Sequence, residues 1–282
     1  MSARLKIAFQ GELGANSHEA CRAYFPEHEP QPCATFEEAF DAVKSGECAL
    51  GMIPVENSIA GRVADVHHLL PSSGLKIIGE HFKPISFQLM ANPGTRLEDV
   101  RTVASMAIAL GQCRKVLRRL KVATEAVGDT AGAAKALSLA PDPGRAAIAP
   151  ALAAEIYGLE ILLRDVEDER HNTTRFLVMS SEANPPRPPF TQQCITAFMF
   201  RVRNVPAALY KALGGFATNG VNMTKLESYM EGGSFSATMF YAEVEGRPED
   251  RGLALAIEEL SFFCEWFELL GVFPADPFRS RV

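Results

Sequence analysis

The amino-acid sequence predicts an α/β protein with two domains, and three observations support that prediction. The chain has 282 residues, more than one ordinary hydrophobic core requires. Its first 165 residues repeat a short apolar run, a turn rich in Gly, Ser, Thr or Asn, and a helical stretch. Four prolines then fall within five positions, at 185–189. We therefore expect domains at residues 1–180 and 194–282, joined by a linker at 181–193.

The N-terminal repeats follow from this pattern. Apolar residues 5–9 predict a strand, the glycines of 11–17 permit a tight turn, and 18–24 have helical spacing. The same criteria predict a helix at 36–44, a strand at 49–55, a polar turn at 56–58, a helix at 63–70, and extended segments at 75–79 and 85–90.

Three further strand and helix pairs follow. Residues 100–104 predict a strand, Ser105 a cap, and 107–120 a helix. Residues 122–127 predict a strand, and Asp129 with Thr130 caps a helix at 131–139. A strand at 146–149 precedes a helix that starts near Pro150 and ends at Gly158.

Alternating strands and helices of this kind predict parallel sheets, with ligands beyond the carboxyl ends of the strands. Four turns would then face one crevice: residues 11–17, residues 56–58, Ser105, and Asp129 with Thr130. Helix N-termini at these turns favour an anion, although most helices need caps without any ligand. No GxGxxG or GxxxxGK[ST] motif occurs, so a small carboxylate fits better than a nucleotide.

Composition excludes several classes of function. A net charge of -6 argues against a nucleic-acid surface. The sequence has no signal peptide and no run of about 18 apolar residues, so we expect a cytoplasmic protein without membrane segments. The six cysteines are scattered without a CxxC pair, which predicts reduced thiols. Adjacent His67 and His68 lack the spacing of metal ligands, and we expect no metal site.

The densest group of hydrogen-bonding side chains is HNTTR at residues 171–175, just before an apolar run at 176–179. Its guanidinium suits two-point binding of a carboxylate or phosphate. The alternative is a polar turn whose side chains bond their own backbone.

The C-terminal region has a different order of elements. Strands are predicted at 194–203, 221–229, 235–244 and 265–273, and helices at 206–218 and 251–264, with Gly232 and Gly233 in the turn between the middle strands. This βαββαβ order predicts a ferredoxin-like unit. Such a sheet commonly pairs its edge with a second copy.

Taken together, these residues resemble those of the prephenate dehydratases with a C-terminal ACT domain. The most specific match is NTTRF at 172–176, similar to the family's NxTRF signature. Other matching landmarks are FQG at 9–11 through Ser17, PVEN at 54–57 with Gly61, Gln112 with Cys113, DTAGAA at 129–134 and AIA at 147–149. The resemblance implies a catalytic domain of two α/β lobes built like a type II periplasmic binding protein, and a homodimer or homotetramer.

Such an enzyme converts prephenate to phenylpyruvate without a cofactor. It must bind anions and supply a proton to the departing hydroxyl. We expect Thr174 to be the proton donor or relay, and Arg175 with the helix N-termini to hold the carboxylates. The remaining expected substrate-binding residues are Asn172, Thr173, Phe176, Glu56, Asn57, Ser17, Ser105 and Thr130. Residues 105–108, SMAI, depart from the family's Ser-His-Pro-Gln, and Asn16 replaces an aromatic residue.

Two alternatives stay open. Arogenate, in which an amine replaces the side-chain keto group, is an equally possible substrate. A chain that only senses a ligand, without turnover, would need the same two-lobed fold and an amino-acid-binding domain.

The resemblance also implies that the C-terminal domain binds phenylalanine between two copies and inhibits the enzyme. The turn from strand to helix at 204–209 can offer backbone N–H groups to a carboxylate. The expected effector residues are Asn204, Ala207, Ala208, Leu209, Glu227 and Ser228. Tyr229 and Met230 depart from the family's ESRP motif, and an ACT domain that only holds the oligomer together is the alternative.

Overall fold

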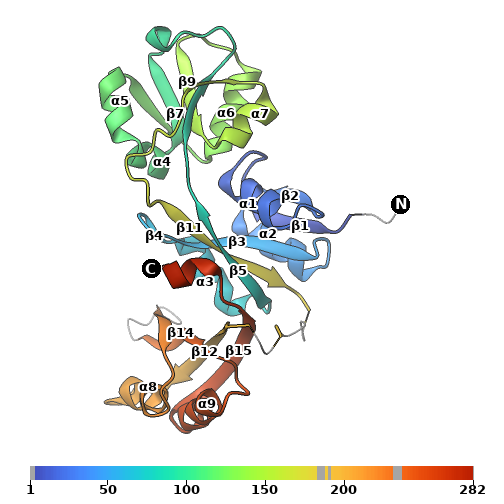
Figure 1. Ribbon diagram of the computed structural model, residues 1–282, viewed down its shortest axis with the longest axis vertical. Helices are drawn as coiled ribbons and strands as arrows, with labels where there is room; N and C mark the ends of the chain where they lie inside the picture. The colour runs from blue at the N-terminus through green and yellow to red at the C-terminus, as the bar shows by residue number, and fades with distance from the viewer. Residues whose placement is uncertain (1–3, 183–187, 190–191, 231–236, 282) are drawn as a thin grey trace. The chain divides into compact units, whose positions relative to one another are not determined.

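The computed structural model describes residues 4–182, 188–189, 192–230 and 237–281. The chain forms two compact units (Figure 1). The first comprises Met1–Ser73 and His81–Leu177, and the second comprises Gly74–Glu80 and Val178–Val282. This division differs from the predicted boundary at residue 180, because one segment from the N-terminal half of the chain clusters with the C-terminal unit.

The first lobe is built on a mixed sheet in the order β2-β1-β3-β11-β5, with β4 paired to β3. Strand β1 is parallel to β2 and β3, and its central residues Ile7, Ala8 and Phe9 are completely buried. The elements are β1 Lys6–Gln10, α1 Asn16–Tyr24, β2 Glu29–Cys33, α2 Phe36–Lys44, β3 Leu50–Asn57, β4 Gly61–Arg62, α3 Ala64–Leu69, β5 Lys76–Pro84 and β11 Thr173–Ser180, with a short 3-10 turn at Leu70–Ser72.

The second lobe has a five-stranded sheet in the order β10-β6-β9-β7-β8. Its elements are β6 Gln88–Ala91, β7 Thr102–Met106, α4 Ala107–Gln112, α5 Arg114–Leu120, β8 Ala123–Val127, α6 Thr130–Leu139, β9 Arg145–Ala149, α7 Ala151–Tyr157 and β10 Glu160–Leu163, with a 3-10 turn at Leu97–Asp99. Strand β7 is parallel to β8 and β9, but β6 is antiparallel to β9 and β10. The sheets are therefore mixed. The expected parallel pairing is found among β1, β2 and β3 and among β7, β8 and β9, but β4, β6 and β10 pair antiparallel.

The helix expected at 107–120 is broken at Cys113 into α4 and α5. The break is stabilised from a distant part of the chain, because the Asp168 carboxylate accepts hydrogen bonds from the backbone N–H groups of Arg114 at 3.0 Å and Lys115 at 2.9 Å. A carboxylate at a helix N-terminus caps it and favours its dipole. Helical spacing alone does not reveal such a cap.

The loop between β1 and α1 packs against the second lobe. A Cβ atom at Gly14 would lie 2.7 Å from Cα of Ala153 in α7, so this close approach requires glycine. The Tyr157 hydroxyl donates to the Leu13 carbonyl at 2.8 Å, and Lys135 pairs with Glu12 at 2.9 Å. These contacts hold the loop between β1 and α1 of the first lobe against α6 and α7 of the second lobe.

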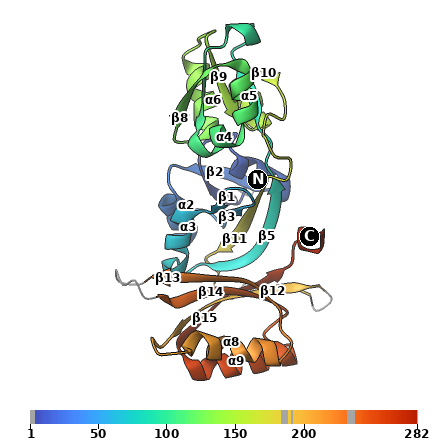
Figure 2. The ribbon, with the colours of Figure 1, turned by 90° about the vertical axis from the view of Figure 1, so that its left-hand side faces the viewer.

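The second unit has the predicted ferredoxin-like fold. Its elements are β12 Cys194–Val202, α8 Ala208–Thr218, β13 Met223–Met230, β14 Ala237–Glu245, α9 Arg251–Phe263 and β15 Cys264–Pro274, followed by a 3-10 turn at Pro277–Arg281. The antiparallel sheet has the order β13-β14-β12-β15, and both helices cover the same face (Figure 2). Gly232 and Gly233 lie outside the described residues.

The beginning of β5 belongs to this second unit and packs closely on β15. A Cβ atom at Gly271 would lie only 2.0 Å from the Ile77 carbonyl oxygen, and the Lys76 ammonium donates to the Leu269 carbonyl at 2.8 Å. Buried Glu80 accepts two hydrogen bonds from the Arg279 guanidinium, at 2.6 and 2.9 Å. The segment 74–80 is thus held by hydrogen bonds to the C-terminal end of the chain.

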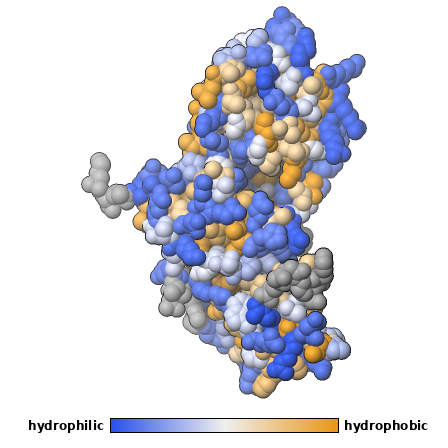
Figure 3. Space-filling model, turned by 180° about the vertical axis from the view of Figure 1, so that it is seen from behind, coloured by the Kyte–Doolittle hydropathy of each residue, from blue (hydrophilic) through white to orange (hydrophobic). Residues whose placement is uncertain are grey.

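The described part of the predicted linker is held in the same unit. The Arg247 guanidinium donates to the carbonyls of Pro188 at 2.7 Å and Gln192 at 3.1 Å, and it also bonds Pro189. On the face drawn in Figure 3, hydrophobic residues are interspersed among hydrophilic ones. None of the described helices is long and apolar enough to span a membrane.

Candidate active site

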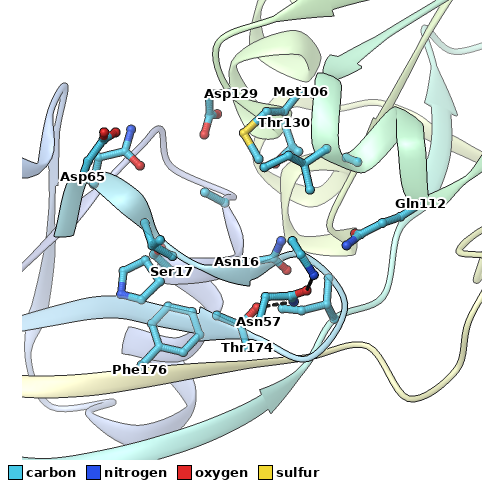
Figure 4. Close-up of a pocket in the computed structure, with 18 of the residues that line it drawn as sticks. Asn16, Ser17, Asn57, Asp65, Met106, Gln112, Asp129, Thr130, Thr174 and Phe176 are labelled. Atoms are coloured by element: carbon cyan, nitrogen blue, oxygen red, sulfur yellow. Dashed lines mark hydrogen bonds between the residues drawn. The ribbon is translucent and has the colours of Figure 1, made fainter. Parts of the chain in front are cut away.

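A cavity of about 460 Å³ lies between the two lobes of the first unit. Figure 4 shows Met106, Asp129 and Thr130 on one side of it, and Thr174 and Phe176 on the other. The polar and charged residues that line the cavity are Gln10, Asn16, Ser17, Asn57, Arg62, Asp65, Gln112, Asp129, Thr130 and Thr174. The turns expected to meet in one crevice therefore do contribute to one cavity, although not through every predicted side chain.

Asn57, at the end of β3, orients the polar floor of the cavity. Its Oδ1 accepts hydrogen bonds from the backbone N–H groups of Ile59 at 3.0 Å and Ala60 at 2.8 Å. Two donors at Oδ1 leave the amide nitrogen to face β11, where it lies 3.0 Å from Thr174 Oγ1 and 2.7 Å from Asn172 Oδ1. The orientation of the Asn57 amide is thus set by backbone groups.

Two consequences follow from this orientation. Thr174 Oγ1 accepts a hydrogen bond from Asn57, so its own O–H proton remains available to a ligand in the cavity. Asn172 accepts through Oδ1 and donates through Nδ2 to Gln112 Oε1 at 3.0 Å. Gln112 therefore has its N–H₂ group free to donate. A hydroxyl and an amide donor meet at this part of the cavity, where a bound oxygen anion would be stabilised.

Arg175 occupies a different environment. Thr174 and Phe176 line the cavity, and side chains alternate along a strand, so Arg175 between them points to the other face of β11. Its side chain is 5% exposed, lies 3.8 Å from a Glu56 carboxylate oxygen, and places the guanidinium carbon 5.7 Å from the centre of the Phe82 ring. Neither Arg175 nor Glu56 lines the cavity, contrary to the expectation of direct substrate contact.

Arg62 is the guanidinium that lines the cavity. It is placed there by β4, a two-residue strand antiparallel to the end of β3, and its Nη1 lies 3.3 Å from His67 Nε2. This arginine was not among the site residues predicted from the sequence. The dipeptide Gly61-Arg62 in the sequence carries no strand signal, although Gly61 has the positive φ of 81° that this turn needs.

The other predicted residues divide into two groups. Ser17 and Thr130 line the cavity. Ser105 does not, because it lies inside β7, is completely buried, and donates to the Ile148 carbonyl at 2.6 Å. The predicted cap at Ser105 was wrong, and Met106 occupies the N-cap of α4. Thr173 also lies outside the cavity lining, with its backbone N–H bonded to Ser58 Oγ at 3.0 Å.

Asp129 caps α6 and borders the cavity. Its Oδ1 accepts the backbone N–H of Gly132 at 2.5 Å, as its position at the helix N-cap predicts. Partial burial raises the pKa of this carboxyl, while backbone hydrogen bonds, that of Gly132 foremost, oppose the rise. Gly11 leaves room for the carboxylate, since a Cβ atom there would lie 3.0 Å from Oδ2.

The cavity also has an apolar wall, to which both lobes contribute. This wall consists of Phe36, Pro54, Ile85, Phe87, Met106, Ile108 and Phe176. Such a surface suits an unsaturated ring or an alkyl chain. Within the described part of the chain, no group of three or more His, Cys, Asp or Glu side chains is placed to hold a metal ion.

Comparisons with known proteins place this chain in a family. Residues 7–184 match the family model described as prephenate dehydratase. The chain is 50% identical, over 98% of each chain, to a bifunctional N-acyl-homoserine lactone acylase/prephenate dehydratase of Komagataeibacter europaeus. It is 36% identical to the chloroplastic arogenate dehydratase/prephenate dehydratase 2 of Arabidopsis thaliana, over 97% of this chain and 74% of that protein. A crystal structure of the Arthrobacter aurescens prephenate dehydratase with L-Phe superposes with a TM-score of 0.86, at 28% identity, covering 96% of this chain and 90% of that one.

Proposed function

Because this chain belongs to the prephenate dehydratase family, we propose that it is a lyase that converts prephenate to phenylpyruvate in phenylalanine biosynthesis. The observation that best supports this activity is the Thr174 hydroxyl, which Asn57 holds with its proton available to the cavity. The same fold without turnover would be a ligand sensor, and such a protein would not need an oriented hydroxyl.

In this reaction the bond between the ring and its carboxylate breaks, and carbon dioxide leaves. The electron pair enters the ring, the bond to the opposite hydroxyl breaks, and that oxygen leaves as water after taking up one proton. Hydroxide is a poor leaving group, so proton donation lowers the barrier. We assign to Thr174 the hydrogen bond to this oxygen and the donation or relay of the proton.

The rest of the cavity would bind and orient the substrate. Arg62 and the Gln112 amide are placed to hold carboxylate oxygens, and the apolar wall to hold the ring. Arg175 then supports the site indirectly, through its ion pair with Glu56 beside the Asn57 turn. Since conversion of the cyclohexadiene ring to an aromatic ring supplies the driving force, we expect the reaction to need no cofactor.

Incubation of the purified chain with prephenate, followed by ultraviolet detection of phenylpyruvate, tests the proposal. Thr174→Ala should lower kcat by about 10² to 10⁴, the range for a lost proton-transfer group, with KM changed much less. Thr174→Ser should retain much of the rate. A KM effect with kcat intact would show Thr174 to be a binding group instead. No turnover by the unmodified chain would favour the sensor.

A second candidate activity is hydrolysis of an N-acyl-homoserine lactone, because the name of the Komagataeibacter relative includes an acylase of these compounds. The apolar wall favours it, because an acyl chain would bury against Phe36, Ile85 and Phe87. The environment of Thr174 argues against it. The Thr174 hydroxyl is hydrogen-bonded to the Asn57 amide and not to a general base that could activate it as a nucleophile. Mass spectrometry for homoserine lactone release would test this activity, and Thr174→Ala would show whether one site performs both reactions.

We also propose that the second unit is an ACT domain that binds phenylalanine between two copies of a homodimer or homotetramer. Asn204, Ala207 and Ser228 are exposed, whereas Ala208 and Leu209 pack in the core and could contribute only backbone groups. Glu227 is paired with Lys225 at 2.8 Å. Saturating phenylalanine should weaken prephenate binding by roughly 5- to 150-fold. Unchanged kinetics and no calorimetric heat would leave the domain a purely structural one.

We further propose a cytoplasmic location. All six cysteines are free thiols, and a reducing compartment keeps thiols in that state. Burial raises the pKa of Cys33 to about 11 and that of Cys113 to about 12, which leaves both thiols protonated and unreactive.

A further inference from the structure

A buried imidazole holds the loop between β1 and α1, residues 11–15, which leads into the cavity residues Asn16 and Ser17. His18 is 7% exposed, and its Nδ1 lies 2.9 Å from the backbone nitrogen of Gly14. The Gly14 N–H can only donate, so Nδ1 must accept and the proton of the neutral ring must lie on Nε2. A protonated ring carries a donor on both nitrogens and cannot accept this bond.

The loop is confined on its other side, so it cannot adjust freely if this bond is lost. Gly14 lies so close to Ala153 of the second lobe that a Cβ atom would not fit between them. The neighbouring Leu13 carbonyl accepts a hydrogen bond from the Tyr157 hydroxyl at 2.8 Å. A movement of Gly14 away from the imidazole would therefore disturb the contact between the lobes and the cavity wall at residues 15–17.

The surroundings of the ring favour its neutral form. β1 presents Phe9 to it, and the two rings stack with centres 5.6 Å apart and planes 7° apart. Burial lowers the pKa of His18, the charge of Arg22 lowers it further, and the charge of Glu19 raises it. A ring that is neutral near pH 7 can accept from Gly14, as the loop requires.

The two charged groups that act on the ring both lie on its own helix, and each is paired with a group from another element. Glu19 lies 2.7 Å from the Lys83 ammonium of β5, and Arg22 lies 3.6 Å from the Glu155 carboxylate of α7. These partners reduce the net field at His18. The hydrogen bond from Gly14 is thus the interaction most directly changed when the ring takes up a proton.

We propose that His18 is a positioning residue for substrate binding: its neutral imidazole holds the loop in the shape that completes the cavity, and protonation releases the loop. The inference rests on the proposed function, which identifies the substrate as prephenate. KM for prephenate should rise as the solution becomes acidic. The value of kcat should change much less, because Thr174 does not belong to this loop.

The same protonation affects stability, with a definite sign. In the unfolded chain His18 takes up a proton near its ordinary pKa of about 6.5. Its pKa in the folded chain is lower, so the unfolded chain binds more protons below that pH. The contribution of His18 to stability is therefore complete above about pH 6.5 and falls as the pH drops from there toward the folded-state pKa.

The test measures KM and kcat for prephenate between pH 5 and pH 8, with a blank for spontaneous conversion of prephenate in acid. In the unmodified chain KM should rise roughly 10-fold at pH 5, the effect of one lost hydrogen bond. His18→Asn places a neutral oxygen where Nδ1 lies, so it should keep KM at pH 8 and remove the rise in acid. His18→Leu, which offers no acceptor, should have a KM raised roughly 10-fold at every pH.

His68→Asn is the matched control, because it removes an exposed imidazole from the same lobe. Its KM should follow the same pH profile as that of the unmodified chain. The inference is overturned if His18→Asn keeps the rise in acid, if His68→Asn removes it, or if His18→Leu leaves KM unchanged at pH 8. If His18→Asn does not fold, His18→Leu decides, because its raised KM should not vary with pH.

Denaturant titration at pH 5 and pH 8 adds a measurement that needs no turnover. The loss of unfolding free energy between pH 8 and pH 5 should be smaller in His18→Asn than in the unmodified chain. Equal losses would also overturn the inference. Absence of turnover by the unmodified chain at every pH would instead contradict the proposed function, and the titration would still test His18.

Discussion

The cavity of the first unit and the sheet of the second both bury hydrogen-bonded polar side chains, but the two networks differ in charge and in where they end. In the cavity, Asn57, Asn172 and Gln112 are neutral, and the network ends in donors that face a ligand. In the second unit, Arg279 joins the carboxylates of Glu80 and Glu243, with distances of 2.6 and 2.8 Å. The Glu243 carboxylate also accepts from the Tyr241 hydroxyl at 2.6 Å.

This difference suggests separate tasks. Neutral amides cost less to remove from water than charged groups do, and they can offer donors to an incoming anion. A buried ion network costs much more to desolvate, and it becomes a liability when one partner is removed. We therefore expect changes in the first network to reduce catalysis, and changes in the second to reduce stability.

The largest expected effect is on stability. Arg279→Met should lower the free energy of unfolding by about 3 to 5 kcal/mol, because it removes a cation from two buried carboxylates. Denaturant titration measures the loss, and kcat per folded molecule should not change. Arg279→Lys keeps the charge without the planar fork and should cost less. A change below about 1 kcal/mol for Arg279→Met would contradict the assignment of a stabilising role.

Asn57→Ala should lower kcat by about 10² to 10³, as the loss of a preorganised hydrogen-bond donor does in other enzymes. Asn92→Ala is a matched control, since Asn92 bonds the Leu137 carbonyl at 3.2 Å and accepts from Asp142 at 3.3 Å in the same unit, outside the cavity lining. Steady-state kinetics should show no loss of kcat for the control. Equal losses in the two variants would mean that Asn57 acts only through folding.

Gln112→Glu should raise KM for prephenate by roughly 10- to 100-fold, because a carboxylate replaces the donor that faces the substrate's negative charge. Gln112→Met, which removes the donor without adding charge, should have a smaller effect. Initial-rate measurements over a range of prephenate concentrations distinguish the two. If Gln112→Met proves the more harmful variant, the amide must orient Asn172 rather than contact the substrate.

The smallest expected effect is in the second unit, where Ala207 has a φ of 63° in the left-handed region. Ala207→Gly should raise the free energy of unfolding by up to about 1 kcal/mol, since glycine avoids that strain. Ala212→Gly should lower it by about 1 kcal/mol or more, because Ala212 lies in the interior of α8. Thermal unfolding measures Tm for both variants. If both substitutions shifted Tm in the same direction, the explanation from local backbone conformation would be wrong.

Some of the site was accessible from the sequence and some was not. The NTTRF run identified Thr174 as a candidate site residue. The helix cap predicted at Asp129 is the N-cap of α6. Strand alternation already contained the information that Arg175 points away from Thr174, since residues one apart on a strand face opposite sides. Ser105 was misplaced because β7 continues through Met106, two residues beyond the predicted end.

Other features depend on contacts between distant residues. Arg62 enters the cavity through the pairing of β4 with β3, and the break at Cys113 depends on Asp168. Gln112 acquires its direction from Asn172, which is 60 positions away. Strand β2, with its two prolines, and the short β10 gave no sequence signal strong enough to predict them. Each of these features requires knowledge of a tertiary contact.

The discontinuous second unit has a consequence for synthesis of the protein. Its segment Gly74–Glu80 is made early, but Arg279, which binds Glu80, lies 199 residues later in the chain. At about 5 to 20 residues per second, a ribosome needs about 10 to 40 s to cover that distance. During this interval the whole second lobe emerges, while Glu80 and Ile77 lack their C-terminal partners. The second unit can therefore complete its folding only after Arg279 has been made, later than every residue of the first unit.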